Sequence, residues 1–252
     1  MQKGNAMPKF FIEKNQITEK QAHILGSDAI HITKVLRLSQ GDTLTLCDGA
    51  GTDYTAKICS ATQDAVVLDI QNSSPCLAEP KLSVTLFQGL PKQGKMDYII
   101  EKCTELGISR IVPVSFHRCV AAVKDHKAEE KKLARWRKIA AESVKQCGRG
   151  IIPEITGVMT PQEAVQFSRS LDLTIAAYEN ERDVPLKTVL ESHTPNSVGI
   201  LIGPEGGFET DEIRLFAENG IPSVTLGRRI LRTETAGCAV LTAVMYAYDE
   251  LN

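Results

Sequence analysis

The chain has 252 residues, of which 42% are hydrophobic and 24% are charged, with a formal net charge of −2. These values are ordinary for a globular protein. No apolar run approaches the roughly 20 residues of a membrane-spanning helix, and the N-terminus lacks the apolar stretch of an export signal. Seven cysteines lie scattered without a CxxC pair or a Cys/His cluster. We therefore expect reduced thiols, a cytoplasmic protein and no metal site.

The small net charge hides an uneven distribution. Lys and Arg outnumber Asp and Glu by 15 to 7 between residues 81 and 150, whereas the acids outnumber the bases by 15 to 7 from residue 151 onward. A basic face is typical of proteins that bind a polyanion such as a nucleic acid. The same residues also fit the solvated face of one long helix, so this cluster alone leaves both interpretations open.

The first part of the chain predicts a small β-rich domain. Short apolar and β-branched runs between turns predict strands at 9–12, 43–47, 53–58 and 65–70. Residues 23–35 predict an intervening helix, and this combination is typical of a small barrel. The polar segment 72–75 predicts a linker. We place the first domain at residues 1–75 and the second at 76–252.

Beyond residue 80, strands alternate with helices. Strands are expected at 82–88, 110–114, 173–177, 198–202 and 223–226. The helices between them include 128–147, with Trp136 in its apolar face, and one with Thr210 as its N-cap. A last helix begins at Thr233 or Thr235. This alternation predicts an α/β domain with a mostly parallel sheet that is covered on both faces.

Two loops near the end of the chain carry the clearest functional signal. The first has the sequence Gly-Pro-Glu-Gly-Gly-Phe at 203–208, and the second spans 226–236. Each follows a predicted strand, and open α/β sheets bind ligands beyond the carboxyl ends of their strands. Glycines also allow a ligand to approach the backbone closely. GxxxxGK[ST] is absent, as is GxGxxG after a first βαβ strand, so the common nucleotide motifs are excluded.

Alternatives stay open for the individual loop residues. The first loop could be an ordinary tight turn. Ile230 and Leu231 are apolar within a polar loop, and could either pack on a flat ring such as adenine or fill a gap in the core. Arg232 and Glu234 begin a helix, and could either act on a ligand or pair with each other.

The motifs IGPEGGF and LGRRILRTETA resemble the ribosomal RNA small-subunit methyltransferase E family, which belongs to the SPOUT class of S-adenosylmethionine-dependent RNA methyltransferases. Further blocks of the resemblance are HITKVLR (31–37), CDGAG (47–51), LPK (90–92), ELG (105–107), QCGR (146–149) and AYE (177–179). The resemblance covers nearly the whole chain past Met7. The departures are minor: Gly237 and Cys238 stand where alanine-like residues are expected.

The resemblance implies a PUA-like barrel for RNA recognition and a SPOUT-type parallel sheet with a C-terminal trefoil knot. It also implies a homodimer that methylates N3 of a uridine in 16S rRNA of the small ribosomal subunit. Three loops would surround S-adenosylmethionine. The expected cofactor-binding residues are Ala177, Tyr178, Glu179, Gly203, Pro204, Glu205, Gly206, Gly207, Leu226, Gly227, Ile230, Leu231, Thr235 and Ala236.

Methylation of uridine N3 requires that the imide proton leave, or that charge developing on O2 and O4 be stabilised. The candidate catalytic residues are Glu234, as the base, and Arg232, as the charge stabiliser. Glu205 is a second candidate base, although it could instead brace its own loop, and Glu234 could instead cap its helix. Phosphate contacts, which position RNA without reading its sequence, are expected from Arg37, Lys92, Arg118 and Arg149; Arg149 is also a second candidate charge stabiliser.

Three rival functions remain. The first is a SPOUT methyltransferase that acts on tRNA or on another rRNA position. The second is a non-catalytic RNA-binding protein of ribosome assembly, against which the intact loops argue. The third is a nucleotide-binding metabolic enzyme, which the missing phosphate motifs and the β-rich N-terminal domain disfavour. The second rival would have kept the pocket but lost the chemistry. Thermal stabilisation by S-adenosylmethionine or its demethylated product is the measurement expected to discriminate, because a ligand that binds only the native state raises stability.

Overall fold

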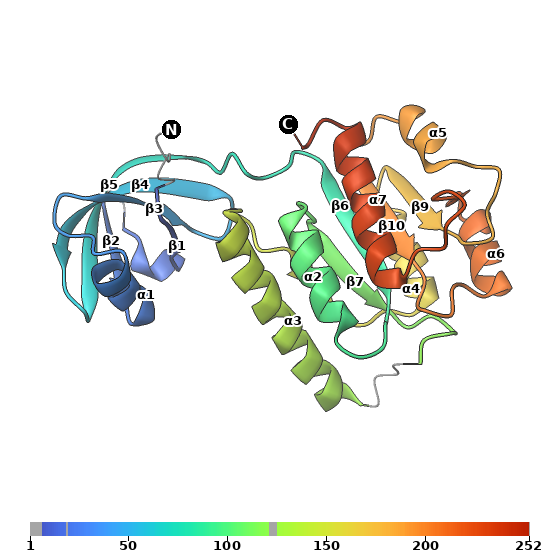
Figure 1. Cartoon of the computed structure of the whole chain (residues 1–252), viewed down its shortest axis with the longest axis horizontal. Coiled ribbons are helices and arrows are strands. Elements are labelled where there is room, and N and C mark those ends of the chain that lie inside the picture. The colour runs from blue at the N-terminus through green and yellow to red at the C-terminus, as the bar shows by residue number, and fades with distance from the viewer. Residues whose placement is uncertain (1–6, 19, 121–124, 252) are drawn as a thin grey trace. The chain divides into compact units, whose positions relative to one another are not determined.

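The structure is a computed structural model that describes residues 7–18, 20–120 and 125–251 (Figure 1). Contacts divide the chain into two compact units. The first holds residues up to 79 together with 144–152, and the second holds 80–143 together with the residues from 153 onward. The domain boundary expected after residue 75 stays a prediction.

The first unit contains a curled five-stranded sheet with the order β1-β3-β4-β5-β2, in which only β1 and β3 pair in parallel. Alternate strand residues point inward and form one core, as the period of two dictates. The elements are β1 (Lys9–Phe11), β2 (Gln21–Leu25), α1 (Ser27–Ile30), a π-helical turn (His31–Val35), β3 (Thr43–Cys47), β4 (Thr52–Ala61) and β5 (Ala65–Pro75).

Two predictions for this unit are wrong. Residues 23–35 do not form one helix, because Gln21–Leu25 is an edge strand whose burial alternates, with only Ala22 and Ile24 inside. Gly26, at φ +65°, separates this strand from α1. The segment 72–75 is not a linker, because it continues β5 and pairs with β4.

Residues 144–152 pack on the barrel through a buried polar cluster. The Lys9 ammonium donates to Asp53 Oδ2 at 3.0 Å and to the Gly148 carbonyl at 3.1 Å. Arg149 is 4% exposed, and its guanidinium donates to both carboxylate oxygens of Glu79. Glu79 Oε1 also accepts the N–H groups of Gly150 and Ile151. A buried, multiply bonded ion pair therefore fixes this loop.

We expect Arg149→Ala to lower the free energy of unfolding by about 3–5 kcal/mol, because it leaves the Glu79 carboxylate buried without its partner. Urea unfolding followed by circular dichroism measures the loss. The matched control is Lys187→Ala, which removes an exposed ion pair with Glu191 and should change stability by less than about 1 kcal/mol. If the two substitutions lowered the free energy of unfolding equally, the buried Arg149–Glu79 pair would not be a major contribution to stability.

The ion pair between Glu79 and Arg149 also makes the stability of the protein depend on pH. Burial alone would raise the pKa of Glu79, but Arg149 and the two backbone N–H groups lower it below the ordinary value of 4.5. A lowered folded-state pKa stabilises the protein above the unfolded-state pKa, and this contribution disappears as the pH falls through the folded value. Acid unfolding below pH 4.5 should therefore be shallower in Glu79→Gln than in the parent chain.

The second unit contains a six-stranded parallel sheet with the order β11-β9-β10-β6-β7-β8. The α/β class and the parallel sheet are thus confirmed. Its strands are β6 (Ser83–Gly89), β7 (Arg110–Val114), β8 (Glu154–Ile155), β9 (Leu173–Ala177), β10 (Ser197–Ile202) and β11 (Ser223–Val224). Its helices are α2 (Lys95–Glu105), α3 (His126–Cys147), whose last turn belongs to the first unit, α4 (Pro161–Ser168), α5 (Leu186–Glu191), α6 (Thr210–Glu218) and α7 (Thr233–Ala247).

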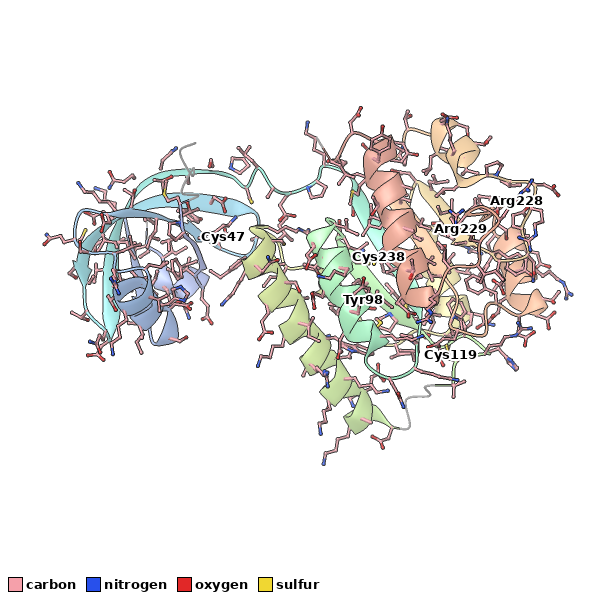
Figure 2. All side chains as sticks on the ribbon, viewed as in Figure 1. Cys47, Tyr98, Cys119, Arg228, Arg229 and Cys238 are labelled. Atoms are coloured by element: carbon pink, nitrogen blue, oxygen red, sulfur yellow. The ribbon has the colours of Figure 1, made fainter. Side chains whose placement is uncertain are left out.

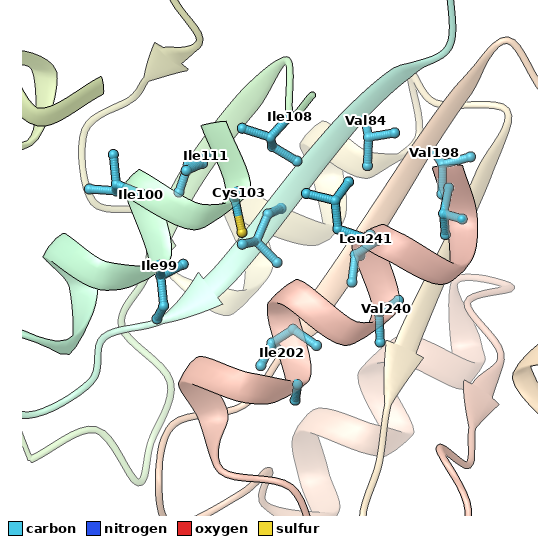
Figure 3. Close-up of a cluster of buried hydrophobic side chains, with 14 of the residues drawn as sticks. Val84, Ile99, Ile100, Cys103, Ile108, Ile111, Val198, Ile202, Val240 and Leu241 are labelled. Atoms are coloured by element: carbon cyan, nitrogen blue, oxygen red, sulfur yellow. The ribbon is translucent and has the colours of Figure 1, made fainter. Parts of the chain in front are cut away.

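Hydrophobic cores cover both faces of this sheet, as the sequence predicted. On one face, strand residues such as Val84 and Ile202 pack against α2 and α7 (Figure 3). Trp136 of α3 belongs to the same core and is 6% exposed, which confirms its packing role. On the opposite face, residues such as Phe87 pack with α4 and α6. Within the described residues, no helix is long and apolar enough to cross a membrane.

Some details of this unit differ from the prediction. Short α4 and α5 were not expected, although Thr160 and Glu163 form a capping box with Pro161 at the first helical position. Thr210 is not an N-cap, because Glu209 takes that position and forms a capping box with Glu212. The strand expected at 223–226 ends at Val224.

Candidate functional site

Four loops meet at one edge of the parallel sheet. Strands β11, β9, β10 and β6 are consecutive neighbours, so their carboxyl ends lie side by side. The residues that follow these ends are 225–232, 178–185, 203–209 and 90–94. Because parallel strands all end at the same edge, the sheet order brings the two motif loops together with two loops that flank them.

Three of these loops, those after β9, β10 and β11, line a cavity of about 540 Å³ together with Lys95, the first residue of α2; this volume is within the range of small-molecule sites. All the expected cofactor-binding residues line it except Thr235, which is exposed at the start of α7. Of the two candidate catalytic residues, Arg232 lines it and Glu234 does not. The lining also includes residues that were not among the expected cofactor-binding or catalytic residues: Lys95, Arg182, Ile202, Thr225, Arg229 and Thr233. The described residues contain no cluster of potential metal ligands.

The first motif loop is anchored at its C-terminal end. Phe208 is buried and packs edge-to-face on Phe116 and Phe216, with ring centroids 5.0 and 5.2 Å apart. Gly207 has φ +70°, and a Cβ there would lie 1.9 Å from Glu179 Oε1. Position 207 therefore favours glycine for both its backbone angle and its close neighbour.

A buried hydrogen-bond chain joins the two motif loops. Gln88, at the end of β6, donates from Nε2 to Thr233 Oγ1 at 2.8 Å, and Thr233 Oγ1 donates to the Gly203 carbonyl at 2.7 Å. Gln88 is fully buried and Thr233 is 6% exposed. Because buried hydrogen bonds are costly to break, these two hydrogen bonds fix the start of α7 against the loop after β10.

One lysine bridges the two candidate bases. Lys95 Nζ lies 3.1 Å from Glu205 Oε1 and 3.1 Å from Glu234 Oε2. Both carboxylates raise the pKa of Lys95, which keeps it cationic at neutral pH. Lys95 is the first residue of α2 and follows Gly94, which has φ +63°. The Lys95 cation therefore reaches the pocket from the start of α2, which follows β6, the strand beside β10.

The two glutamates differ in what their oxygens accept. Glu205 Oε1 accepts the Lys92 N–H at 2.9 Å. Burial alone would raise the pKa of Glu205, but that N–H, its own N–H and Lys95 lower it overall. Glu234 Oε2 is buried and lies 3.1 Å from Lys95 Nζ, but unlike Glu205 Oε1 it accepts no backbone N–H. Glu205 is thus held as an anion that braces its loop, whereas Glu234 is paired with Lys95 and does not hold a backbone group.

The four residues expected to contact RNA are placed very differently. Arg37 is exposed in the first unit, in a left-handed backbone conformation at φ +55°, and the Lys92 side chain is exposed at the pocket edge. Arg118 instead forms two hydrogen bonds with Glu209 and one with the Gly206 carbonyl. Arg149 is buried against Glu79. RNA contacts by these residues stay predictions, and the geometry favours the first two.

Sequence reasoning assigned no role in the site to Lys95, Gln88 or Thr233, for a physical reason. Each contributes through a contact across the sheet edge, which depends on β6 lying beside β10 rather than on any local pattern. The signal nearest to Lys95 was the Leu-Pro-Lys block at 90–92, three residues before it.

Comparisons with known proteins agree with this geometry. The family model described as an RNA methyltransferase domain matches residues 78–245, and the one described as an RNA methyltransferase PUA domain matches residues 24–71. Ribosomal RNA small subunit methyltransferase E of Bacillus subtilis is 34% identical, over 97% of this chain and 98% of its own length. The protein of that name from Buchnera aphidicola is 30% identical, over 98% and 96%.

Solved structures show the same relationship. Ribosomal RNA small subunit methyltransferase E of Neisseria gonorrhoeae, bound to S-adenosyl methionine, superposes with a TM-score of 0.81 at 28% identity, over 96% of this chain and 98% of that one. A methyltransferase of Legionella pneumophila, in complex with the same cofactor, gives 0.78 at 29% identity over the same shares. The chain therefore belongs to the family of RNA methyltransferases whose curated members are named ribosomal RNA small subunit methyltransferase E.

Proposed function

We propose that this chain transfers the methyl group of S-adenosylmethionine to N3 of a uridine in the 16S rRNA of the small ribosomal subunit. The observation that carries the proposal is the cavity at the carboxyl ends of β9, β10 and β11, lined by the family's loops in a chain that matches full-length relatives. Membership of the family supports rRNA of the small subunit as the substrate. The resemblance described above supports uridine N3.

The residues of the cavity fit the cofactor. Its volume suits a nucleoside-sized molecule. At Gly227, which has φ +98°, an added Cβ would meet no atom within 4 Å, so bare backbone faces open space there. Ala177, Leu226, Ile230 and Leu231 offer apolar surface for a flat ring. When bound, S-adenosylmethionine supplies the electrophilic methyl group, and the chain supplies orientation and proton handling.

The chain's own residues divide the chemistry between them. Glu234 takes the imide proton; its carboxylate adjoins the cavity through Lys95, which lines the cavity and lies 3.1 Å from Glu234 Oε2. The cationic Lys95 and the exposed Arg232, which both line the cavity, stabilise negative charge on O2 and O4 of the uracil. Glu205 holds Lys95 and the β6–α2 loop in place through its contacts.

Four broader predictions belong to the same proposal. The barrel of residues 1–75 recognises RNA, as the match to a PUA domain supports, and residues 76–252 form the catalytic domain. The chain end threads a trefoil knot, a rare topology that would account for α7 returning beside the Gly203 loop. The protein acts as a homodimer. It works in the cytoplasm, in keeping with its seven free cysteines.

One experiment tests the proposal. Small subunits from a strain that lacks the protein are incubated with the purified chain and labelled S-adenosylmethionine, and the modified nucleotide is mapped. We expect label at N3 of one uridine in 16S rRNA, and thermal stabilisation of the chain by the cofactor. Label on tRNA or at another rRNA atom would overturn the specific assignment. Cofactor binding without transfer to RNA would favour a non-catalytic assembly protein.

A further inference from the structure

The arginines of the second unit fall into two groups. Most contact an oxygen acceptor: a carboxylate, an amide or a carbonyl. These are Arg110, Arg118, Arg135, Arg137, Arg169 and Arg214. Within the described part of the second unit, four arginine side chains have no hydrogen bond or ion pair: Arg182, Arg228, Arg229 and Arg232.

All four lie at the cavity. Arg182, Arg229 and Arg232 line it, and Arg228 directly precedes Arg229 in an exposed stretch of the loop after β11. Figure 2 shows Arg228 and Arg229 on this loop, at the outer edge of the unit. Arg182 comes from the separate loop after β9. Two loops therefore converge to place unpaired cations around one opening.

A shortage of carboxylates does not explain this arrangement. Between residues 151 and 252, acidic residues outnumber basic ones by 15 to 7, and Arg169 and Arg214 in this region do find partners. Unpaired like charges on neighbouring loops repel one another, which slightly destabilises the free protein. Their free guanidinium groups remain available for an anion that arrives from outside.

We infer that Arg182, Arg228 and Arg229 bind the phosphodiester backbone of the RNA on either side of the methylated nucleotide. The inference rests on the proposed function and names the residues that deliver the substrate. A uracil base carries no charge, so its placement in the cavity depends on contacts to the neighbouring phosphates. Guanidinium groups suit this task because they are always charged and donate two parallel hydrogen bonds to a phosphate.

The alternative anion is the carboxylate of the cofactor. It is a single carboxylate, which one guanidinium or a pair of backbone N–H groups can satisfy. Arg228 does not line the cavity, so the arginine cluster extends beyond the space that a cofactor would fill. A chain of phosphates crossing the opening matches the extended arrangement better than one carboxylate does.

The test compares RNA binding with cofactor binding. Arg182→Gln, Arg228→Gln and Arg229→Gln are each measured for binding to unmodified small subunits over a series of potassium chloride concentrations, and for S-adenosylmethionine affinity by calorimetry. The association constant K falls as the salt concentration rises. Each substitution should make the slope of log K against log salt less negative by about 0.7, the value for one contact to single-stranded nucleic acid. The KM for subunits should rise, while the cofactor Kd stays unchanged. Arg229→Lys, which keeps the charge, should retain the slope.

The matched control is Arg214→Gln, which removes an exposed arginine that is already paired with Asp211 of α6 and should leave the slope unchanged. An unchanged slope in all three cavity variants would overturn the inference. Loss of cofactor affinity with normal subunit binding would also overturn it, and would assign the arginines to the cofactor carboxylate. A parent chain that binds cofactor but methylates no RNA would instead refute the proposed function, independently of these variants.

Discussion

Replacing Glu234 by Gln should lower kcat by about 10²- to 10⁴-fold, the usual contribution of a general base, and should leave S-adenosylmethionine affinity within about threefold. The substitution keeps the shape of the side chain but removes its ability to take a proton. Uridine N3 is a poor nucleophile until its imide proton leaves, so the chemical step should carry the loss. Substrate binding should be little affected.

The structure favours Glu234 over Glu205 as this base. Glu205 Oε1 already accepts a backbone N–H and contacts Lys95, and its lowered pKa makes it a weak proton acceptor. Glu234 lies in the first turn of α7. Its Oε2 contacts Lys95 but holds no backbone N–H of a loop. Loss of Glu205 should therefore disturb the loop, whereas loss of Glu234 should disturb the chemistry.

Single-turnover methylation of small subunits measures the effect, with Glu101→Gln as control. Glu101 is an exposed glutamate of α2 that pairs with Lys102, whereas Glu234 pairs with Lys95 of the cavity lining, so the Glu101 variant should keep full activity. Part of the rate lost in Glu234→Gln should return at alkaline pH, where uridine itself begins to lose the N3 proton. A variant that is inactive at every pH and binds cofactor poorly would show that Glu234 is structural.

The elements with strong local signals were predicted correctly. Strands 110–114 and 173–177 match the structure residue for residue, because continuous apolar runs in a doubly covered parallel sheet are unambiguous. Residues 23–25 were wrongly assigned to a helix because the alternation of the short strand 21–25 competes with the helical spacing of the residues that follow. The segment 72–75 looks like a linker by composition, but pairing with β4 overrides that local preference.

In the site, too, residues with a local sequence signal were predicted and residues placed by long-range contacts were not. The motif loops could be predicted because their glycines and arginines are contiguous in sequence, and they do line one cavity. Lys95 could not be predicted, because its role depends on the neighbouring order of β6 and β10. Arg118 and Arg149 look like free cations in the sequence, but each has a carboxylate partner more than 60 positions away. Long-range pairing thus decides which basic residues remain available to RNA.

Gly89→Ala should weaken S-adenosylmethionine binding by at least about tenfold and lower the free energy of unfolding by about 1–3 kcal/mol, the usual cost of overpacking. A Cβ at Gly89 would lie 2.5 Å from Pro204 N and 2.9 Å from Gly203 C. These are backbone atoms that cannot rotate away, so the loop after β10 must move. Calorimetry with the cofactor and urea unfolding measure the two effects.

The displacement should act on the pocket rather than on the fold as a whole. Gly203 accepts the Thr233 hydroxyl, and Thr233 is held by Gln88, the residue before Gly89. Moving the loop therefore strains the chain of bonds that fixes the start of α7. In the control Gly157→Ala, the nearest atom to the new Cβ is Glu129 Oε1, at 3.4 Å, and a flexible side chain can yield. If Gly89→Ala binds the cofactor as tightly as Gly157→Ala does, the close approach of β6 to the Gly203 loop does not shape the pocket.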